Sequence, residues 1–220
     1  MPSTTSNIPQ HRAIVAQCET YLHQHGDSHL GVGWPNEEDA RVRYQVMLDL
    51  LESAAQQGPV RVLDFGCGFS HLYDYLLARQ VPNVVYEGLD LSETHLQIAR
   101  QKHPGILYHS FDVLESEAEL PTYDFILLNG IFTQKCSLSF DDMWAYCQRL
   151  LQVLWPKASQ GLAFNVMSKQ VDWERDDLFH MPMDLLAGFV RKELTRHFAF
   201  RHDYGLYEYT TYLLRQPRRD

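Results

Sequence analysis

The segment VRVLDFGCGFSHLYDYLLARQ, residues 60–80, decides the fold class of this chain. Its first six residues form a short, β-branched and nearly continuous apolar run, which predicts a buried strand. Gly66 and Gly68 follow and predict a tight turn, and a helix is predicted from His71 onward. A buried strand that turns at glycines into a helix is typical of an α/β protein.

The alternation of strand and helix continues after this segment. Four further strands are predicted, at 84–90, 106–111, 123–129 and 161–168. Strand–helix–strand units at this spacing need crossover connections, so these strands are expected to be parallel, with helices on both faces of the sheet.

The C-terminal end has a different pattern. After a helix around residues 183–196, the runs AFRHDY (199–204) and EYTTYLLR (208–215) are predicted strands, separated by a short turn that contains Gly205. Such a tight connection joins antiparallel strands. The prediction is therefore a doubly wound, mostly parallel sheet of seven strands with a C-terminal antiparallel strand.

The first 57 residues are predicted to be a helical extension. Apolar residues recur at helical spacing over residues 12–25, and a glycine-rich loop that starts at Gly26 leads to a second helix. Asn36 is expected to cap this second helix, and Gly58 to end it. We divide the chain into the extension, residues 1–57, and an α/β domain, residues 58–216.

Composition limits the classes of partner. The 220 residues include 19 Lys and Arg against 28 Asp and Glu, a formal net charge of -9. Such a surface repels polyanions, so neither nucleic acid nor an anionic membrane is an expected partner. The four cysteines have no zinc or redox spacing, and no apolar run is long enough for a signal core or a membrane span. A cytoplasmic monomer or homodimer without a bound metal is expected.

Acidic side chains follow the first three predicted strands. Asp64 lies beside the glycine turn, Asp90 ends the second strand and Asp112 follows the third. Ligands bind beyond the carboxyl ends of the strands in a doubly wound sheet, where an acid after the second strand can accept both hydroxyls of a ribose. An acid beside the glycines suits a cationic amino group. His71 replaces the third glycine of the dinucleotide fingerprint, so the expected ligand is not a dinucleotide.

These motifs together resemble the class I S-adenosylmethionine-dependent methyltransferases. The matching segments are VLDFGCGFS (62–70), GLDLS (88–92), FDV (111–113) and YDFILLN (123–129), and the similarity covers about residues 58–215. The resemblance implies a Rossmann-like fold, S-adenosyl-L-methionine as the cofactor and S-adenosyl-L-homocysteine as its product. The first motif of this family often ends in a third glycine, where this chain has Ser70, whose hydroxyl is expected to cap the next helix.

The resemblance also implies which residues surround the cofactor. These are Asp64, Gly66 and Gly68 around its methionine part, Asp90 at its ribose, Asp112 and Val113 at its adenine, and Asn129 at the methyl-transfer cleft. Cys67 and Leu91 are also expected to bind the cofactor. Extensions in such enzymes commonly cover the cofactor as a lid. Within the extension, Trp34 is either a lid aromatic or a packing anchor, and Arg43 either binds the cofactor's carboxylate or is a solvated charge.

The methyl acceptor is expected to be a small polar molecule. Gly130-Ile131-Phe132 follows Asn129, in place of the Pro-Pro-aromatic sequence typical of enzymes that methylate amino groups of nucleic acids. The long polar loop 169–182, with Trp173, Arg175 and His180, is a candidate acceptor site. Because imidazole titrates near neutral pH, the candidate general bases are His180, His29 and His71, of which His180 and His29 are the predicted catalytic residues.

We therefore expect a methyltransferase that transfers a methyl group to an oxygen or nitrogen of a small polar acceptor. Two alternatives stay open. One is a non-catalytic, cofactor-binding regulatory or partner subunit. The other is an aminopropyl transferase on the same fold, although the paired acids usual in that class after the fourth strand are not evident.

Overall fold

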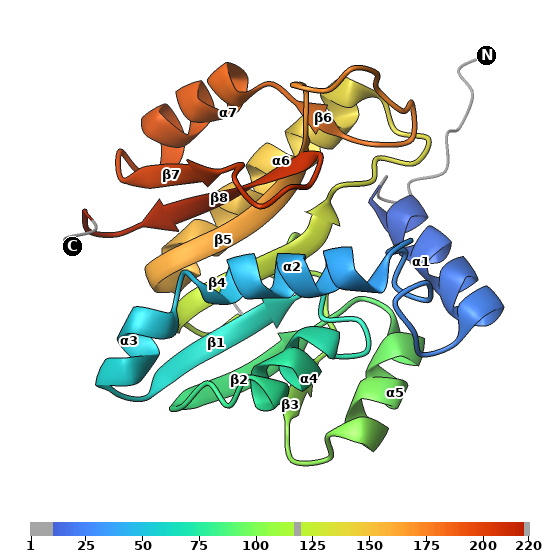
Figure 1. Cartoon of the computed structure of the whole chain (residues 1–220), viewed down its shortest axis with the longest axis vertical. Coiled ribbons are helices and arrows are strands. Elements are labelled where there is room, and N and C mark those ends of the chain that lie inside the picture. The colour runs from blue at the N-terminus through green and yellow to red at the C-terminus, as the bar shows by residue number, and fades with distance from the viewer. Residues whose placement is uncertain (1–10, 117–119, 218–220) are drawn as a thin grey trace.

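One sheet forms the centre of the molecule (Figure 1). The computed structural model describes residues 11–116 and 120–217, and within these ranges eight strands form this sheet. The strands are β1 (Val60–Phe65), β2 (Val84–Leu89), β3 (Leu107–His109), β4 (Tyr123–Phe132), β5 (Ala158–Ser168), β6 (His180–Met181), β7 (Phe198–Arg201) and β8 (Glu208–Leu214).

Seven helices and two shorter turns accompany the strands in the described part of the chain. The α-helices are α1 (Arg12–His25), α2 (Glu37–Leu48), α3 (Glu52–Gln57), α4 (His71–Ala78), α5 (Glu93–Lys102), α6 (Phe140–Leu154) and α7 (Met183–Phe189). A 3₁₀ turn over Trp155–Lys157 follows α6, and a π-helical turn over Val190–Leu194 follows α7.

The strand order is β3-β2-β1-β4-β5-β8-β7, and β6 pairs with β5 outside this path. Strands β1 to β5 pair with one another in parallel, whereas β8 is antiparallel to both β5 and β7. This confirms the predicted doubly wound, mostly parallel sheet with a C-terminal antiparallel strand. The two-residue β6 was not predicted. The chain extends from β1 first to one side of the sheet and then to the other, so the topological switch point lies between β1 and β4.

Successive residues of each strand face opposite sides of the sheet and build two cores. On one side, α6 and α7 pack against residues such as Leu63, Ile126 and Phe164. On the other side, α2, α3 and α4 pack against Val62 and Leu127, and Figure 1 shows α2 and α4 crossing in front of the strands. The arrangement leaves the carboxyl ends of β1 and β4 facing α1.

Two local details differ from the expectations. The second predicted helix is divided into α2 and α3 by residues 49–51, although Asn36 caps α2 as expected, accepting from the backbone N–H of Glu38 at 2.9 Å. Ser70 does not cap α4. Its φ is +62°, in the left-handed region that favours glycine, and its hydroxyl donates to Tyr108 at 2.9 Å instead.

The extension divides into two parts with different packing. Helix α1 lies off the carboxyl ends of the central strands (Figure 1), whereas α2 and α3 belong to one of the two cores. Residues 1–10 of the extension lie outside the described residues, and the boundary at residues 57 and 58 stays a prediction. None of the helices in the described ranges is long and apolar enough to cross a membrane.

Candidate functional site

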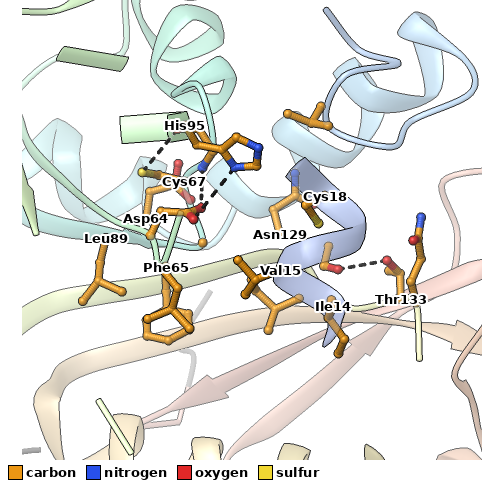
Figure 2. Close-up of a pocket in the computed structure, with 18 of the residues that line it drawn as sticks. Ile14, Val15, Cys18, Asp64, Phe65, Cys67, Leu89, His95, Asn129 and Thr133 are labelled. Carbon is orange, nitrogen blue, oxygen red and sulfur yellow. Dashed lines mark hydrogen bonds and ion pairs between the residues drawn. The ribbon is translucent and has the colours of Figure 1, made fainter. Parts of the chain in front are cut away.

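A pocket lies at the carboxyl ends of the parallel strands, at the switch point of the sheet (Figure 2). The glycine turn after β1, the residues that follow β2 and β3, and the end of β4 form its walls. Helix α1 runs across it, and Ile14, Val15 and Cys18 are among the residues of α1 that line it (Figure 2). In doubly wound sheets this is where ligands bind.

The glycine turn brings the backbone of β1 close to the ligand side of the pocket. Gly66 has φ +74° and Gly68 has φ +52°, which side-chain-bearing residues rarely adopt. A Cβ on Gly66 would also lie only 2.1 Å from Cδ1 of Ile131. The turn is held by the N–H of Gly66, which donates to the carbonyl of Leu89 at 2.7 Å.

Asp90, at the end of β2, connects two walls of the pocket. One carboxylate oxygen accepts from the N–H of Gly68 at 2.9 Å, and the other from the N–H of Ser92 at 2.8 Å. Burial raises the pKa of the Asp90 carboxyl, while the nearby His95 and these backbone N–H groups act in the opposite direction. The carboxylate is therefore fixed in orientation at the rim of the glycine turn.

Asp64 is the most buried of the three acids, with 3% of its surface exposed. Its carboxylate accepts from the hydroxyl of Tyr86 at 2.7 Å. Burial raises its pKa to about 7, because the bond from Tyr86 offsets the desolvation only in part and the charge of Asp90 adds to the increase. Asp64 is thus a carboxyl that changes its charge near neutral pH.

Asp112, after β3, contacts His11, the residue just before α1. Its Oδ2 lies 2.8 Å from Nε2 of His11, and its Oδ1 accepts from the N–H of Leu114 at 2.9 Å. The ring of His11 stacks on Tyr146, with the ring planes 7° apart and the centroids separated by 5.2 Å. Further along, in the middle of α1, Glu19 accepts from the hydroxyl of Ser92 at 2.7 Å. Helix α1 is therefore attached to the pocket at two of the strand ends.

Asn129 supplies an unused acceptor. Its side-chain oxygen Oδ1 is buried and has no hydrogen-bond partner among the residues that the structure describes. A buried polar atom left in this state costs about 1–3 kcal/mol. A ligand that brings an N–H or O–H group to this part of the pocket would satisfy the atom.

The charges around the pocket favour a cation. Asp64, Asp90 and Asp112 line it, whereas the described lining includes no lysine and no arginine. The other ionisable groups with basic character are His11, His71 and His95. Because charges interact strongly in a partly apolar cleft, three carboxyls suit a ligand with positively charged groups, such as a sulfonium and an ammonium.

Comparison with known proteins gives the family. A family model described as a methyltransferase domain matches residues 63–158. The putative methyltransferase Rv1506c of Mycobacterium tuberculosis is 30% identical over 158 residues, which cover 69% of this chain and 91% of that protein. The chain belongs to the class I S-adenosylmethionine-dependent methyltransferase family. It is therefore a methyltransferase that uses S-adenosylmethionine, and the two alternatives left open by the sequence are set aside.

Two further proteins are similar to this methyltransferase, one in fold and one over part of the sequence. Magnesium protoporphyrin IX methyltransferase from Synechocystis PCC 6803, solved with bound cofactor, has the same fold, with a TM-score of 0.64, 15% identity and coverage of 97% of this chain and 100% of that chain. Trans-aconitate 2-methyltransferase of Methylobacterium nodulans is 35% identical over 83 residues, 38% of this chain and 31% of that protein.

Most residues expected around the cofactor line the pocket of the methyltransferase, and Arg43 does not. Those in the lining are Trp34, Asp64, Gly66, Cys67, Gly68, Asp90, Leu91, Asp112, Val113 and Asn129. Nε of Arg43 instead donates to the buried carboxylate of Glu208 at 2.7 Å, and its guanidinium carbon lies 4.1 Å from the ring centre of Trp34. Arg43 is thus neither a solvated charge nor part of the pocket wall.

The two histidines predicted to be catalytic lie outside the pocket lining. Nδ1 of His180 is bonded to the carbonyl of Ser168 at 2.7 Å, and its Nε2 accepts from the N–H of Arg175 at 3.3 Å. His29 belongs to the loop before α2, where its carbonyl accepts from the N–H of Trp34. Of the three candidate bases, His71 lines the pocket, with Nε2 2.6 Å from Oδ1 of Asp27.

The loop 169–182 is also absent from the described lining. Trp173 is exposed, Arg175 pairs with Asp177, and the loop packs against the segment after β4, where the N–H of Lys135 donates to the carbonyl of Asp177 at 2.9 Å. The loop therefore packs against residues 133–134, which line the pocket.

Sequence reasoning missed individual residues of α1 that line the pocket. These residues are Ile14, Val15, Cys18 and Tyr21, and the apolar pattern at helical spacing over residues 12–25 is the signal that could have identified them. The local sequence pattern does not show what that apolar face packs against. His11 precedes the helix and had no distinguishing signal.

Proposed function

We propose that this methyltransferase transfers a methyl group to an oxygen or nitrogen atom of a small polar acceptor. The observation that carries the proposal is the unpartnered Oδ1 of Asn129, buried in a pocket with three carboxyls and neither lysine nor arginine in its described lining. Such a pocket suits a cationic cofactor together with an acceptor that donates a hydrogen bond through its reacting N–H or O–H group.

On the cofactor side, the proposal gives each strand end a role. Asp64 and the glycine turn would hold the methionine part, with the carboxylate facing the ammonium group. Asp90 would accept from the ribose hydroxyls, and Asp112 from the amino group of adenine. The fixed orientation of Asp90 by Gly68 and Ser92 supports this, because a carboxylate that is already oriented loses little conformational entropy on binding.

When bound, the cofactor supplies an electrophilic methyl group on a sulfonium. The protein's part is then to align the acceptor with that methyl group and to exclude water. Oδ1 of Asn129 would accept a hydrogen bond from the neutral N–H or O–H group of the acceptor and orient its lone pair. The proton that this group loses on methylation would pass to solvent as the product is released. Helix α1 and Trp34 would cover the cofactor and the methyl acceptor.

The charge of the pocket also indicates a different acceptor from the one in the name of a relative. Trans-aconitate, the substrate in the name of the partly similar enzyme, is a tricarboxylate, which needs cationic side chains for tight binding. Because the described lining has three acids and neither lysine nor arginine, we propose a neutral or cationic acceptor. An amine or an alcohol fits, whereas a polycarboxylate does not.

Radiolabelled methyl transfer tests the proposal. The protein is incubated with methyl-labelled S-adenosylmethionine and separate panels of small amines, alcohols or phenols, and carboxylic acids. Label is expected in an amine or hydroxyl product. The variant D90A should lose this activity, and the matched control D203A, which removes an exposed carboxylate of the β7–β8 turn, should keep it.

Label found in carboxylic acids alone, or in added protein or RNA and in no small molecule, would overturn the proposed acceptor class. Transfer that D90A and D203A support equally well would overturn the role given to Asp90.

A further inference from the structure

Five residues form a closed ring of contacts behind one wall of the pocket. Nε of Arg43 donates to Oε2 of Glu208 at 2.7 Å, and Nδ2 of Asn165 donates to the other oxygen, Oε1, at 2.8 Å. Oδ1 of Asn165 accepts from the N–H of Gly130 at 2.7 Å. Trp34 closes the ring, since it lies under the guanidinium of Arg43 and against Gly130.

Stability is a poor explanation for this ring. Glu208 and Asn165 are 1% and 0% exposed, and Nη1 of Arg43 is buried without a hydrogen-bond partner among the described residues. Replacing a buried ion pair by apolar residues of similar volume is often neutral or stabilising, because removing two charges from water is costly. The ring joins α2, β4, β5 and β8, and it reaches the pocket at two points.

The two points are Gly130 and Trp34. The N–H of Gly130 is held by Asn165, and its carbonyl accepts from the hydroxyl of Thr133 at 2.9 Å, so the backbone next to Asn129 is fixed on both sides. A Cβ on Gly130 would lie 2.8 Å from Cζ2 of Trp34, which shows how closely the indole packs there. The position of both pocket residues thus depends on groups outside the pocket lining.

We propose that Asn165 and Glu208 are positioning residues for methyl transfer. Through Gly130 they orient Asn129, and through Arg43 they hold Trp34 in place. This inference rests on the proposed position of Asn129 at the methyl-transfer end of the pocket. The pattern of donors and acceptors carries it: Glu208 faces two donors with two acceptor oxygens, so Asn165 can turn only its carbonyl toward the N–H of Gly130.

The pattern can be broken and restored without a large change in volume. Arg43 and Asn165 face different oxygens of Glu208, and in E208Q one of these oxygens is replaced by an NH₂ donor. Either two donors then meet, or Asn165 rotates and turns its NH₂ group toward Gly130. In the double variant N165D/E208Q, the new aspartate accepts from Gly130 and from the glutamine amide, and the glutamine oxygen accepts from Arg43. Every hydrogen bond of the ring is then possible again.

Calorimetry measures the affinities for S-adenosylhomocysteine and sinefungin, and their ratio tests the effect of the ring on the pocket. Sinefungin carries an amino group where the cofactor carries its reacting methyl, so its affinity relative to S-adenosylhomocysteine reports on the acceptor groups at that point. E208Q is expected to lower this affinity ratio by about tenfold, the loss of about one hydrogen bond to a charged group. Affinity for S-adenosylhomocysteine itself should stay within about threefold, and N165D/E208Q should recover most of the ratio.

Two control variants separate the possible outcomes. N129A should lower the same ratio, and an unchanged ratio would overturn the proposed position of Asn129, whatever the ring does. If N129A lowers the ratio and a folded E208Q does not, the role of the ring is wrong. Tyr209 is on the same strand as Glu208, and its buried hydroxyl donates to the carbonyl of Met181 on β6. The variant Y209F removes this hydrogen bond and should leave the affinity ratio unchanged. An equal loss in Y209F would overturn the inference, because it would show a general effect of weakened packing.

Thermal unfolding keeps the inference testable if E208Q does not fold. The double variant should then fold while each single variant does not, because only the double variant restores the pattern of donors and acceptors. A double variant that unfolds as readily as the single variants would overturn the inference.

Discussion

At the scale of single residues, Asp64 is a buried acid of the pocket whose pKa is raised toward neutrality. It is 3% exposed, and burial raises its pKa to about 7 even though Tyr86 donates a hydrogen bond to it. Near pH 7 the neutral and ionised forms are therefore both populated. A cationic ligand binds the ionised form better, so binding should release a proton.

The affinity for S-adenosylhomocysteine, which retains the ammonium group, is accordingly expected to rise about tenfold between pH 6 and pH 8 as Asp64 ionises. In D64N this part of the pH dependence should be absent. Calorimetry in two buffers of different ionisation enthalpy measures the proton released. An equal pH dependence in D64N would assign the effect to another group.

The stability of the free protein depends on pH in the opposite direction. The folded state holds the proton of Asp64 more tightly than the unfolded state, so the contribution of Asp64 to the free energy of unfolding falls as the pH rises from about 4 through 7.

Residue types alone misplaced the charged and titratable candidates of the site. Arg43 was one candidate partner for the carboxylate of the cofactor. In the structure it pairs with a carboxylate of the protein, that of Glu208, 165 residues further along the chain. His180 was predicted from its chemistry, whereas in the structure its ring nitrogens bond to the backbone of Ser168, at the end of β5, and of Arg175, in the loop before β6. The acids at the strand ends were placed correctly in the pocket lining because the fold itself brings strand ends together.

At the scale of elements, α1 is the cover of the pocket. Its apolar residues Ile14, Val15 and Cys18 line the pocket, and it is attached to the strand ends by two polar contacts, one of His11 just before the helix and one of Glu19 in its middle. The contact between Glu19 and Ser92 is a bond of 2.7 Å to a residue that is 1% exposed, whereas Arg12 and Glu115 are 3.5 Å apart and about half exposed. The first contact should matter more, since exposed ion pairs contribute little.

Glu19→Ala is therefore expected to speed the dissociation of S-adenosylhomocysteine about two- to tenfold, the effect of losing one hydrogen bond of about 0.5–1.5 kcal/mol. Hydrogen exchange in residues 12–25 should increase as well. Stopped-flow displacement and exchange mass spectrometry measure the two effects. Arg12→Ala, on the same helix, is the control and should change neither. Unaltered dissociation and exchange in Glu19→Ala would show that this contact does not hold the cover closed.

The order and type of most elements followed from local patterns. Helix 12–25 and strand 60–65 have the predicted bounds, because periodicity and flanking turn residues act over a few positions. The break after α2 was not visible, since Leu50 and Leu51 continue the apolar pattern while the backbone turns to follow the sheet. Ser70 has a glycine-like φ because its hydroxyl and backbone are held within the core, beside Tyr108, a neighbour distant in sequence.

At the scale of the whole molecule, the N-terminal extension is not one unit. Helix α1 lies over the pocket, but α2 and α3 complete the core on one side of the sheet. Met47, Leu48 and Leu51 are fully buried there. The hydroxyl of Tyr212, on β8, also donates to the carbonyl of Val46. The first and last parts of the described chain therefore stabilise each other across the sheet.

Two truncations test this division. Removing residues 1–30 should leave a cooperatively folded protein that binds S-adenosylhomocysteine weakly, because α1 and the start of the following loop are lost while α2 and α3 stay. Removing residues 1–57 should prevent cooperative folding. Burying Met47, Leu48 and Leu51 contributes about 1.5–3 kcal/mol each, and their sum is a large part of the 5–15 kcal/mol that typically stabilises a domain. Calorimetric unfolding distinguishes the two results. A sharp transition in the shorter protein would show that the sheet and its remaining helices form a sufficient core, and that residues 1–57 are an accessory unit, as the sequence had suggested.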